Sequence, residues 1–294
     1  MNYLKLLYIT IAIIYFQHSF AQTDSTSVEE SNIQNYTPSK LLEKGKWDIK
    51  WFNNLYSENK FEKNGDIINK PRENYFSTSL EVFTGISNNK KVNLGFIIDY
   101  RSNTFLDKNI GTVFNFENKF KESRSGLAHF APSVKISPFN SLSNFSFQTS
   151  FYIPLFKEES NLNGYLAEKS FIFQNRFFYD YTFSANKFQL FSELNTRFFF
   201  GEKGKGYANN SLELTPGLFL SYFATPKFTI LGFVQQEVLI DLGNKYSKNY
   251  TALGFGSKYQ ISKTINIEAL YSKFVRGNDS GLGQSFNFGI RGIF

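Results

Sequence analysis

Cysteine is absent from this chain of 294 residues. Its absence excludes a disulfide scaffold, thiolate metal ligands, a cysteine nucleophile and a lipid-modified amino-terminal cysteine. Histidine is almost absent as well, since only His18 and His129 occur, and this excludes a histidine-rich metal site. The glycines of GEKGKG at 201–206 are interpreted as turn residues and not as a phosphate-binding loop. The sequence therefore predicts no metal and no cofactor.

Long hydrophobic runs are missing after the first residues. The chain begins MNYLKLLYITIAIIYFQHSFAQ, in which Lys5 precedes an apolar run, and Ser19 and Ala21 take positions −3 and −1 of a cleavage site before Gln22. This order is typical of a secretory signal peptide, which we predict over residues 1–21. Its apolar run is too short to cross about 30 Å of hydrocarbon as an anchor. No later segment holds about 18 consecutive apolar residues, so the exported chain either dissolves or crosses a membrane as strands.

Charge of neither sign dominates the mature chain. The net charge of +7 falls to +6 when Lys5 leaves with the signal peptide, because 31 basic and 25 acidic residues remain. No polybasic block is present, so a nucleic-acid partner is not expected. Residues 22–46 are polar with few large apolar side chains, and they are predicted to form a flexible amino-terminal arm.

Aromatic residues are abundant, with 36 Phe and 17 Tyr, yet the mean hydropathy is negative. The two facts agree if aromatic and polar residues alternate one by one, as in strands with one apolar and one polar face. This alternation repeats from Trp47 to the end of the chain, without helical periodicity. Twelve strands are predicted, at about 47–57, 74–87, 91–104, 125–137, 143–155, 169–182, 187–200, 208–223, 227–240, 249–260, 264–276 and 284–294.

Short and long connections alternate between these segments. Tight turns at 87–90, 137–143, 184–187, 224–227 and 262–264 alternate with longer polar connections such as 58–73 and 157–169. This pattern predicts an all-β, membrane-spanning, up-and-down antiparallel barrel over residues 47–294, with both termini on the tight-turn, periplasmic side. A secreted β-sandwich would also alternate, but it gives no reason for such asymmetric connections.

The chain ends QSFNFGIRGIF, an alternating strand with an aromatic last residue. We expect this strand to pair with the first one, because an open sheet edge in hydrocarbon costs several kcal/mol per unpaired group. Phe286, Phe288, Ile290 and Phe294 resemble the carboxy-terminal sorting signal of Gram-negative outer-membrane proteins. The resemblance implies recognition by the barrel assembly machinery and contact with outer-membrane lipid and lipopolysaccharide. KGKWDIKWFNNLY, KFQLFSELN and GLGQSFNFGIRGIF are similar to segments of an uncharacterised group of outer-membrane barrels often labelled as transporters or porin-like, which implies no settled function.

Nearly all strand charges fall on the polar parity, which the barrel model directs to the lumen. A charge at the lipid midplane costs about 2–4 kcal/mol, so this segregation favours the barrel. The same rule places Arg276 inside. Registers estimated across the tight turns predict these charged groups: Lys258, Glu268 and Arg291 in the lower lumen; Arg176 with Glu193; Glu213 and Glu237 with Arg197; and Glu81, Asp99 and Arg101. Two interpretations stay open, ion pairs that stiffen the wall or rows that orient a polar or zwitterionic solute.

Bulky residues share the lumen parity and predict a narrow interior. They are Phe83, Ile97, Phe178, Phe191, Phe199, Phe219, Leu231 and Phe233. A narrow passive channel for small solutes is the favoured function, and a closed barrel that acts as an anchor or binds partners is the alternative. An enzyme is not expected and no catalytic residue is predicted, because His129 is the one mature histidine and Ala131 stands where barrel phospholipases have serine.

Overall fold

The computed structural model describes residues 37–157, 164–201 and 208–294. Within these ranges the chain is all-β apart from the short 3-10 helix η2 (Ile110–Asn115). The fold predicted from the sequence is confirmed. The strands are β1 (Trp47–Lys63), β2 (Asp66–Gly85), β3 (Val92–Thr104), β4 (Ser123–Ile136), β5 (Phe145–Pro154), β6 (Phe171–Phe183), β7 (Phe188–Phe200), β8 (Ser211–Thr225), β9 (Phe228–Asp241), β10 (Lys248–Gln260), β11 (Ile265–Asn278), β12 (Ser280–Gly281) and β13 (Gln284–Ile293). No helix in the described part of the chain is long and apolar enough to cross a membrane.

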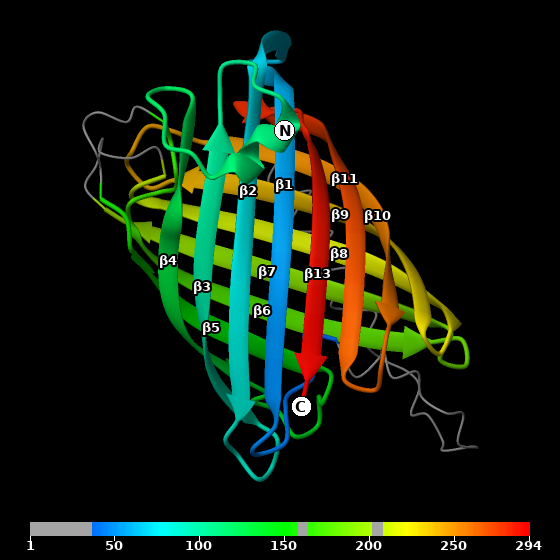
Figure 1. Cartoon of the computed structure of the whole chain (residues 1–294). Helices are drawn as coiled ribbons and strands as arrows, with labels where there is room; N and C mark the ends of the chain where they lie inside the picture. The colour runs from blue at the N-terminus through cyan, green and yellow to red at the C-terminus, as the bar shows by residue number, and fades with distance from the viewer. Residues whose placement is uncertain (1–36, 158–163, 202–207) are drawn as a thin grey trace. The chain divides into compact units, whose positions relative to one another are not determined.

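The sheet closes on itself through its first and last long strands (Figure 1). Trp51 on β1 lies opposite Leu80 on β2 and opposite Ile290 on β13, so β1 has a partner on both sides. Past β13, the backbones of Trp47 and Phe294 exchange two hydrogen bonds of 2.9 Å. Each long strand is antiparallel to its neighbours, and the two-residue β12 adds to the outer part of β1. Closure leaves no open edge, as backbone in hydrocarbon requires.

The barrel is apolar outside and polar inside. Along β7, Leu190 and Leu194 are 38% and 39% exposed on the exterior, whereas Gln189, next to Leu190, is 4% exposed. On β13, Phe286 and Phe288 are exposed and Ser285 is buried. An aliphatic and aromatic exterior over a polar interior is the inverse of a soluble sandwich, and it suits a barrel surrounded by lipid.

The first hairpin is longer than the sequence pattern predicted. The segment 58–73 was expected to be a long connection, but β1 and β2 run on to Lys63 and Asp66, which pair directly. Asn64 and Gly65 make the turn with φ of 53° and 91°. Positive φ at both central residues is the two-residue hairpin turn that Asn-Gly favours, because its twist matches that of the strands. The sequence therefore contained the signal for a hairpin, Asn-Gly, but the polar residues on both sides of it suggested a long connection.

Replacing Gly65 by Ala is expected to lower the free energy of unfolding by about 1 kcal/mol. The added Cβ meets no atom within 4 Å, so the cost comes only from holding a residue with a Cβ at positive φ. Urea unfolding of the barrel measures the effect, and Ala in place of Asn64, which also has positive φ, is a second probe of the same turn. A Gly65→Ala variant as stable as the parent would contradict the turn geometry.

A bulge in the β10–β11 pair corrects one parity assignment. Thr251 lies opposite Arg276, but the next residue, Ala252, lies opposite Phe274, so Val275 is an extra residue. Side-chain alternation shifts by one position beyond the extra residue. Arg276 is therefore exposed, whereas strict alternation placed it in the lumen.

Candidate functional site: the barrel lumen

The lumen contains a cavity of about 480 Å³. Its wall combines aromatic rings, amides, hydroxyls and charged groups drawn from β1, β2, β6 to β11 and β13. All of these strands turn their polar parity inward, which is why residues distant in sequence share one cavity. Its volume lies in the range of small-molecule sites, about 300–1,000 Å³.

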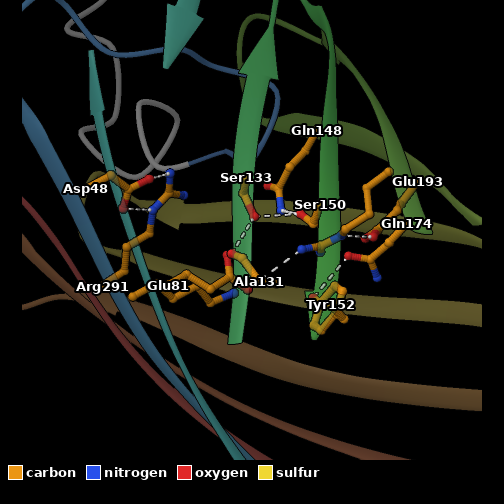
Figure 2. Close-up of polar contacts among 12 residues, drawn as sticks. Asp48, Glu81, Ala131, Ser133, Gln148, Ser150, Tyr152, Gln174, Glu193 and Arg291 are labelled. Carbon is orange, nitrogen blue, oxygen red and sulfur yellow. Dashed lines mark hydrogen bonds and ion pairs between the residues drawn. The ribbon is translucent and has the colours of Figure 1, made fainter. Parts of the chain in front are cut away.

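Two ion-pair groups occupy the lower lumen where the sequence predicted one. Glu268 Oε1 lies 3.1 Å from Lys50 Nζ, and Glu268 Oε2 lies 3.6 Å from Lys258 Nζ. Arg291 borders one small cavity together with Lys258 and Glu268. Its Nε and Nη2 donate to the two oxygens of Asp48 at 2.8 and 2.6 Å, a two-pronged contact (Figure 2). Asp48 and Lys50 on β1 thus supply partners that the sequence prediction lacked, although both alternate with the outward Trp47 and Trp51 in WDIKW.

Arg176 connects two carboxylates across the lumen. Its Nε donates to Glu193 Oε1 at 2.8 Å, the pair that the β6–β7 turn predicted. Its Nη1 also lies 3.7 Å from Glu81 Oε1 on β2. Figure 2 shows Glu81 and Glu193 on opposite sides of this contact region. The guanidinium therefore holds distant parts of the wall together, as a rigid multi-donor group can.

The two carboxylates of the upper lumen have separate basic partners. Arg197 donates to Glu213 through Nε at 2.7 Å and through Nη2. Glu237 Oε1 lies 2.9 Å from Lys248 Nζ, and its Oε2 accepts a 2.9 Å bond from Tyr250. The sequence left Lys248 just outside its predicted strand, so Glu213 and Glu237 looked like a carboxylate pair sharing one arginine. With a basic group on each, they do not form a ready cation site.

The fourth predicted group, of Glu81, Asp99 and Arg101, is not joined by any ion pair within the described residues. Asp99 Oδ2 instead lies 3.8 Å from Nδ1 of His129 on β4. His129 is buried, and its Nε2 lies 3.2 Å from the carbonyl oxygen of Glu168. Because that oxygen can only accept, Nε2 carries the proton and donates. Ser133 bonds to Ser150 at 2.8 Å and not to His129, so this histidine holds structure and is not arranged to activate a serine.

Comparison with known proteins places this barrel among outer-membrane β-barrels by fold. No protein-family model matches the sequence, and no curated protein matches it either. Among solved structures, the COG4313 outer-membrane channel from Pseudomonas putida F1 is similar over 87% of this chain and 98% of its own, with a TM-score of 0.70 and 8% identity. The β domain of the Bordetella autotransporter BrkA is similar over 83% of this chain and 98% of its own, with a TM-score of 0.52 and 12% identity. The chain has the fold of an outer-membrane β-barrel. The resemblance predicted from the sequence is confirmed, and at these identities it concerns the fold alone.

The lower end of the barrel is narrowed by residues 37–46, the last part of the predicted amino-terminal arm. Pro38 borders the main cavity and also two small cavities of about 40 and 20 Å³ beneath it. A water molecule needs about 10–15 Å³ of such space, so the lower cavities admit only a few waters. Among the described residues, these two cavities beside Pro38 are too small for a solute that fits the main cavity. The rest of the predicted arm and the predicted signal peptide lie outside the described residues.

Polar contacts from three strands hold the segment in place. Ser39 is 1% exposed and donates to Asp180 on β6. The backbone N–H of Leu42 donates to Asn93 Oδ1 on β3 at 3.3 Å, and Lys135 on β4 lies 3.5 Å from the carbonyl oxygen of residue 40. Residues 43–46 are held as well, since Gly45 and Lys46 form backbone hydrogen bonds with Gly85, and Lys90 Nζ lies 2.6 Å from Glu43 Oε1. An ordinary hydrogen bond contributes about 0.5–1.5 kcal/mol, so several modest contacts seat the segment.

Bulky side chains fill the lumen wall, as their parity predicted. Phe83, Ile97, Phe178 and Phe199 are buried at 1–5% exposure. Lys135 Nζ lies 5.2 Å from the centre of the Phe178 ring, a cation–π contact that gives this buried lysine a partner besides residue 40. Beside it, Tyr152 donates to Gln174 at 3.1 Å (Figure 2). Ser150, which accepts a hydrogen bond from Ser133, also accepts one from Gln148. This side of the lumen is a closed polar wall.

Proposed function

We propose that the chain forms a narrow passive channel for small polar solutes in the outer membrane, held closed at its lower end by residues 37–46. The observation that carries the proposal is the cavity of about 480 Å³, lined by polar and charged groups, which ends on Pro38. We further propose that the chain is exported by a signal peptide at 1–21, inserted by the barrel assembly machinery, and oriented with both termini at the periplasmic face. Its surroundings would then be outer-membrane lipid and lipopolysaccharide.

The balanced charge of the lumen is more consistent with passive diffusion of solutes than with tight binding of one ion. Lys50, Arg176 and Lys258 line the cavity with Glu81, Glu193 and Glu268, so both signs occur in equal number. A lining that is balanced in charge neither concentrates nor excludes one kind of ion strongly. The same pairs also stiffen the wall, so the two roles that the sequence left open are compatible.

Planar bilayers and vesicles containing the purified full-length barrel test the proposal. We expect discrete current steps, together with swelling of vesicles in isotonic small polar solutes. A folded barrel that gives neither, even after residues 22–42 are deleted, would overturn it. That result would support the second candidate function, a closed barrel that acts as an anchor, which the seated segment at residues 37–46 favours.

Replacing Glu268 by Gln is expected to shift ion selectivity toward anions. The change removes the one carboxylate within 4 Å of both Lys50 and Lys258 and leaves two ammonium groups on the path. One charge about 5 Å from a passing ion contributes about 0.8 kcal/mol even in water-like surroundings. Its removal acts on cations and anions in opposite directions, so the permeability ratio is expected to change by about 1.7 kcal/mol, or roughly fifteen-fold. Reversal potentials in a salt gradient measure it. Glu117→Gln, which makes the same charge change in an exposed loop where Glu117 pairs with Lys119, is the matched control and should leave selectivity unchanged.

A further inference from the structure

One row of cross-strand neighbours in the lumen changes from aromatic to small residues. Paired residue by residue, the row runs through Phe191, Phe219, Phe233, Gly254, Ser272 and Ser285, on β7 to β11 and β13. The ring centroids of the three phenylalanines are 5.6 and 5.1 Å apart in order. The next three positions carry almost no bulk. The main cavity therefore has a continuous aromatic wall that borders a recess lined by hydroxyls.

The rings of Phe219 and Phe233 lie along the wall because a nearby glycine has no side chain in the space that each ring occupies. A Cβ on Gly254 would stand 2.2 Å from Cζ of Phe233, so that ring lies across the glycine of the next strand. A Cβ on Gly217 would likewise stand 3.0 Å from Cε2 of Phe219. Glycine within a strand often marks such a close approach. A ring that lies against the wall presents a face to the lumen, whereas a ring that crossed the lumen would only fill space.

Amides and hydroxyls line the side of the cavity across from the rings. Figure 1 shows β7, β8 and β9 behind β1 and β13, and the same cavity touches both sides. On the near side, Nδ2 of Asn54 donates to Oγ of Ser285 and, at 2.6 Å, to Oδ1 of Asn287. Ser285 and Asn287 act as acceptors in these bonds, so the Ser285 O–H and the Asn287 N–H₂ remain for a solute. The near side thus offers donors and acceptors opposite an aromatic face.

We propose that this cavity binds a neutral, hydroxyl-bearing ring compound of sugar or cyclitol size as it passes through the barrel. Carbon atoms that bear oxygen have electron-poor C–H bonds, and these fit the negative face of an aromatic ring. The hydroxyls at the edge of such a ring exchange hydrogen bonds with Ser272, Ser285 and Asn287. Equal numbers of acidic and basic groups line the cavity, so binding there does not require a charged solute. This inference rests on the proposed function, which brings the solute into the lumen.

Saturation-transfer NMR on the full-length barrel in detergent micelles tests the inference, with methyl β-D-glucopyranoside as the probe. We expect binding of the glycoside and not of sorbitol, a hydroxyl-rich chain that has no ring face to stack. Phe219→Leu should weaken binding roughly three- to ten-fold, the contribution of one good aromatic contact. Phe173→Leu on the exterior, where Phe173 is 39% exposed, is the matched control and should bind as the parent does. Ser272→Ala with Ser285→Ala should also weaken binding, and heat-modifiable migration on gels checks that each variant folds.

Three results would overturn the inference. They are a barrel that does not bind the glycoside, equal binding of glycoside and sorbitol, and binding of benzyl alcohol that depends on Phe219 but not on the two serines. Conductance of the same preparations separates this inference from the proposed function. A barrel that conducts but does not bind the glycoside would refute only the binding site. A barrel that does not conduct but binds the glycoside in a Phe219-dependent way would refute only the channel.

Discussion

A disulfide between residues 39 and 180 is expected to abolish solute flux through the barrel, and its reduction is expected to restore flux. Ser39 and Asp180 are already joined by a side-chain hydrogen bond, so Cys at both positions brings two thiols together. The chain has no other cysteine, and the engineered bond therefore has no competing partner. Vesicle swelling before and after reductant measures the effect. The single variant Ser39→Cys, treated identically, is the control.

Weakening the same contact should have the opposite effect. Ser39→Ala removes one hydrogen bond of about 1 kcal/mol, which raises the population of the unseated segment roughly five-fold while the closed state remains the major one. Flux should rise in proportion. Equal flux through the oxidised and reduced double-cysteine barrel would show that residues 37–46 do not control passage.

The architecture was predictable because one physical demand acts on every strand. Lipid outside and water inside force the alternation that is visible around Leu190, Leu194 and Glu193, and the demand for closed edges pairs β13 with β1. Alternation acts locally along each strand, and closure of the edges acts on the whole sheet. Neither depends on which side chains contact one another. Connections were less predictable, since polar composition hid the Asn-Gly hairpin at the end of β1.

The charge partners in the lumen were less predictable, because they depend on how neighbouring strands are staggered. Arg176 meets Glu193 across a tight turn, and the turn itself fixes that register. The two-pronged contact of Arg291 with Asp48 was not predicted, because β1 and β13 are far apart in sequence and no turn sets their alignment. The seating of residues 37–46 gave no signal in the sequence, since a short segment without a regular helix or strand has no periodicity. Its burial depends on hydrogen-bond partners on β3, β4 and β6, which lie far from it in the sequence.

Replacing Leu194 by Arg is expected to lower the free energy of unfolding by about 2–4 kcal/mol, whereas Phe200→Arg on the same face of the same strand should cost about 0–1 kcal/mol. Leu194 lies in the middle of β7 and Phe200 at its end, and both are exposed on the exterior. The expected difference arises only if hydrocarbon surrounds the middle of the strand and the lipid headgroups its end.

Urea titration in lipid vesicles measures both values through tryptophan emission. Trp47 and Trp51, the two tryptophans of the chain, are each 47% exposed on the exterior of β1, so their spectrum shifts when lipid is replaced by water. Ser221→Arg is the control for the lumen, because Ser221 borders the main cavity and an arginine there has space and polar neighbours. If Ser221→Arg destabilised the barrel more than Leu194→Arg, the inside and outside would be exchanged. That result would contradict the assignment of the apolar face to lipid and of the charged face to the lumen.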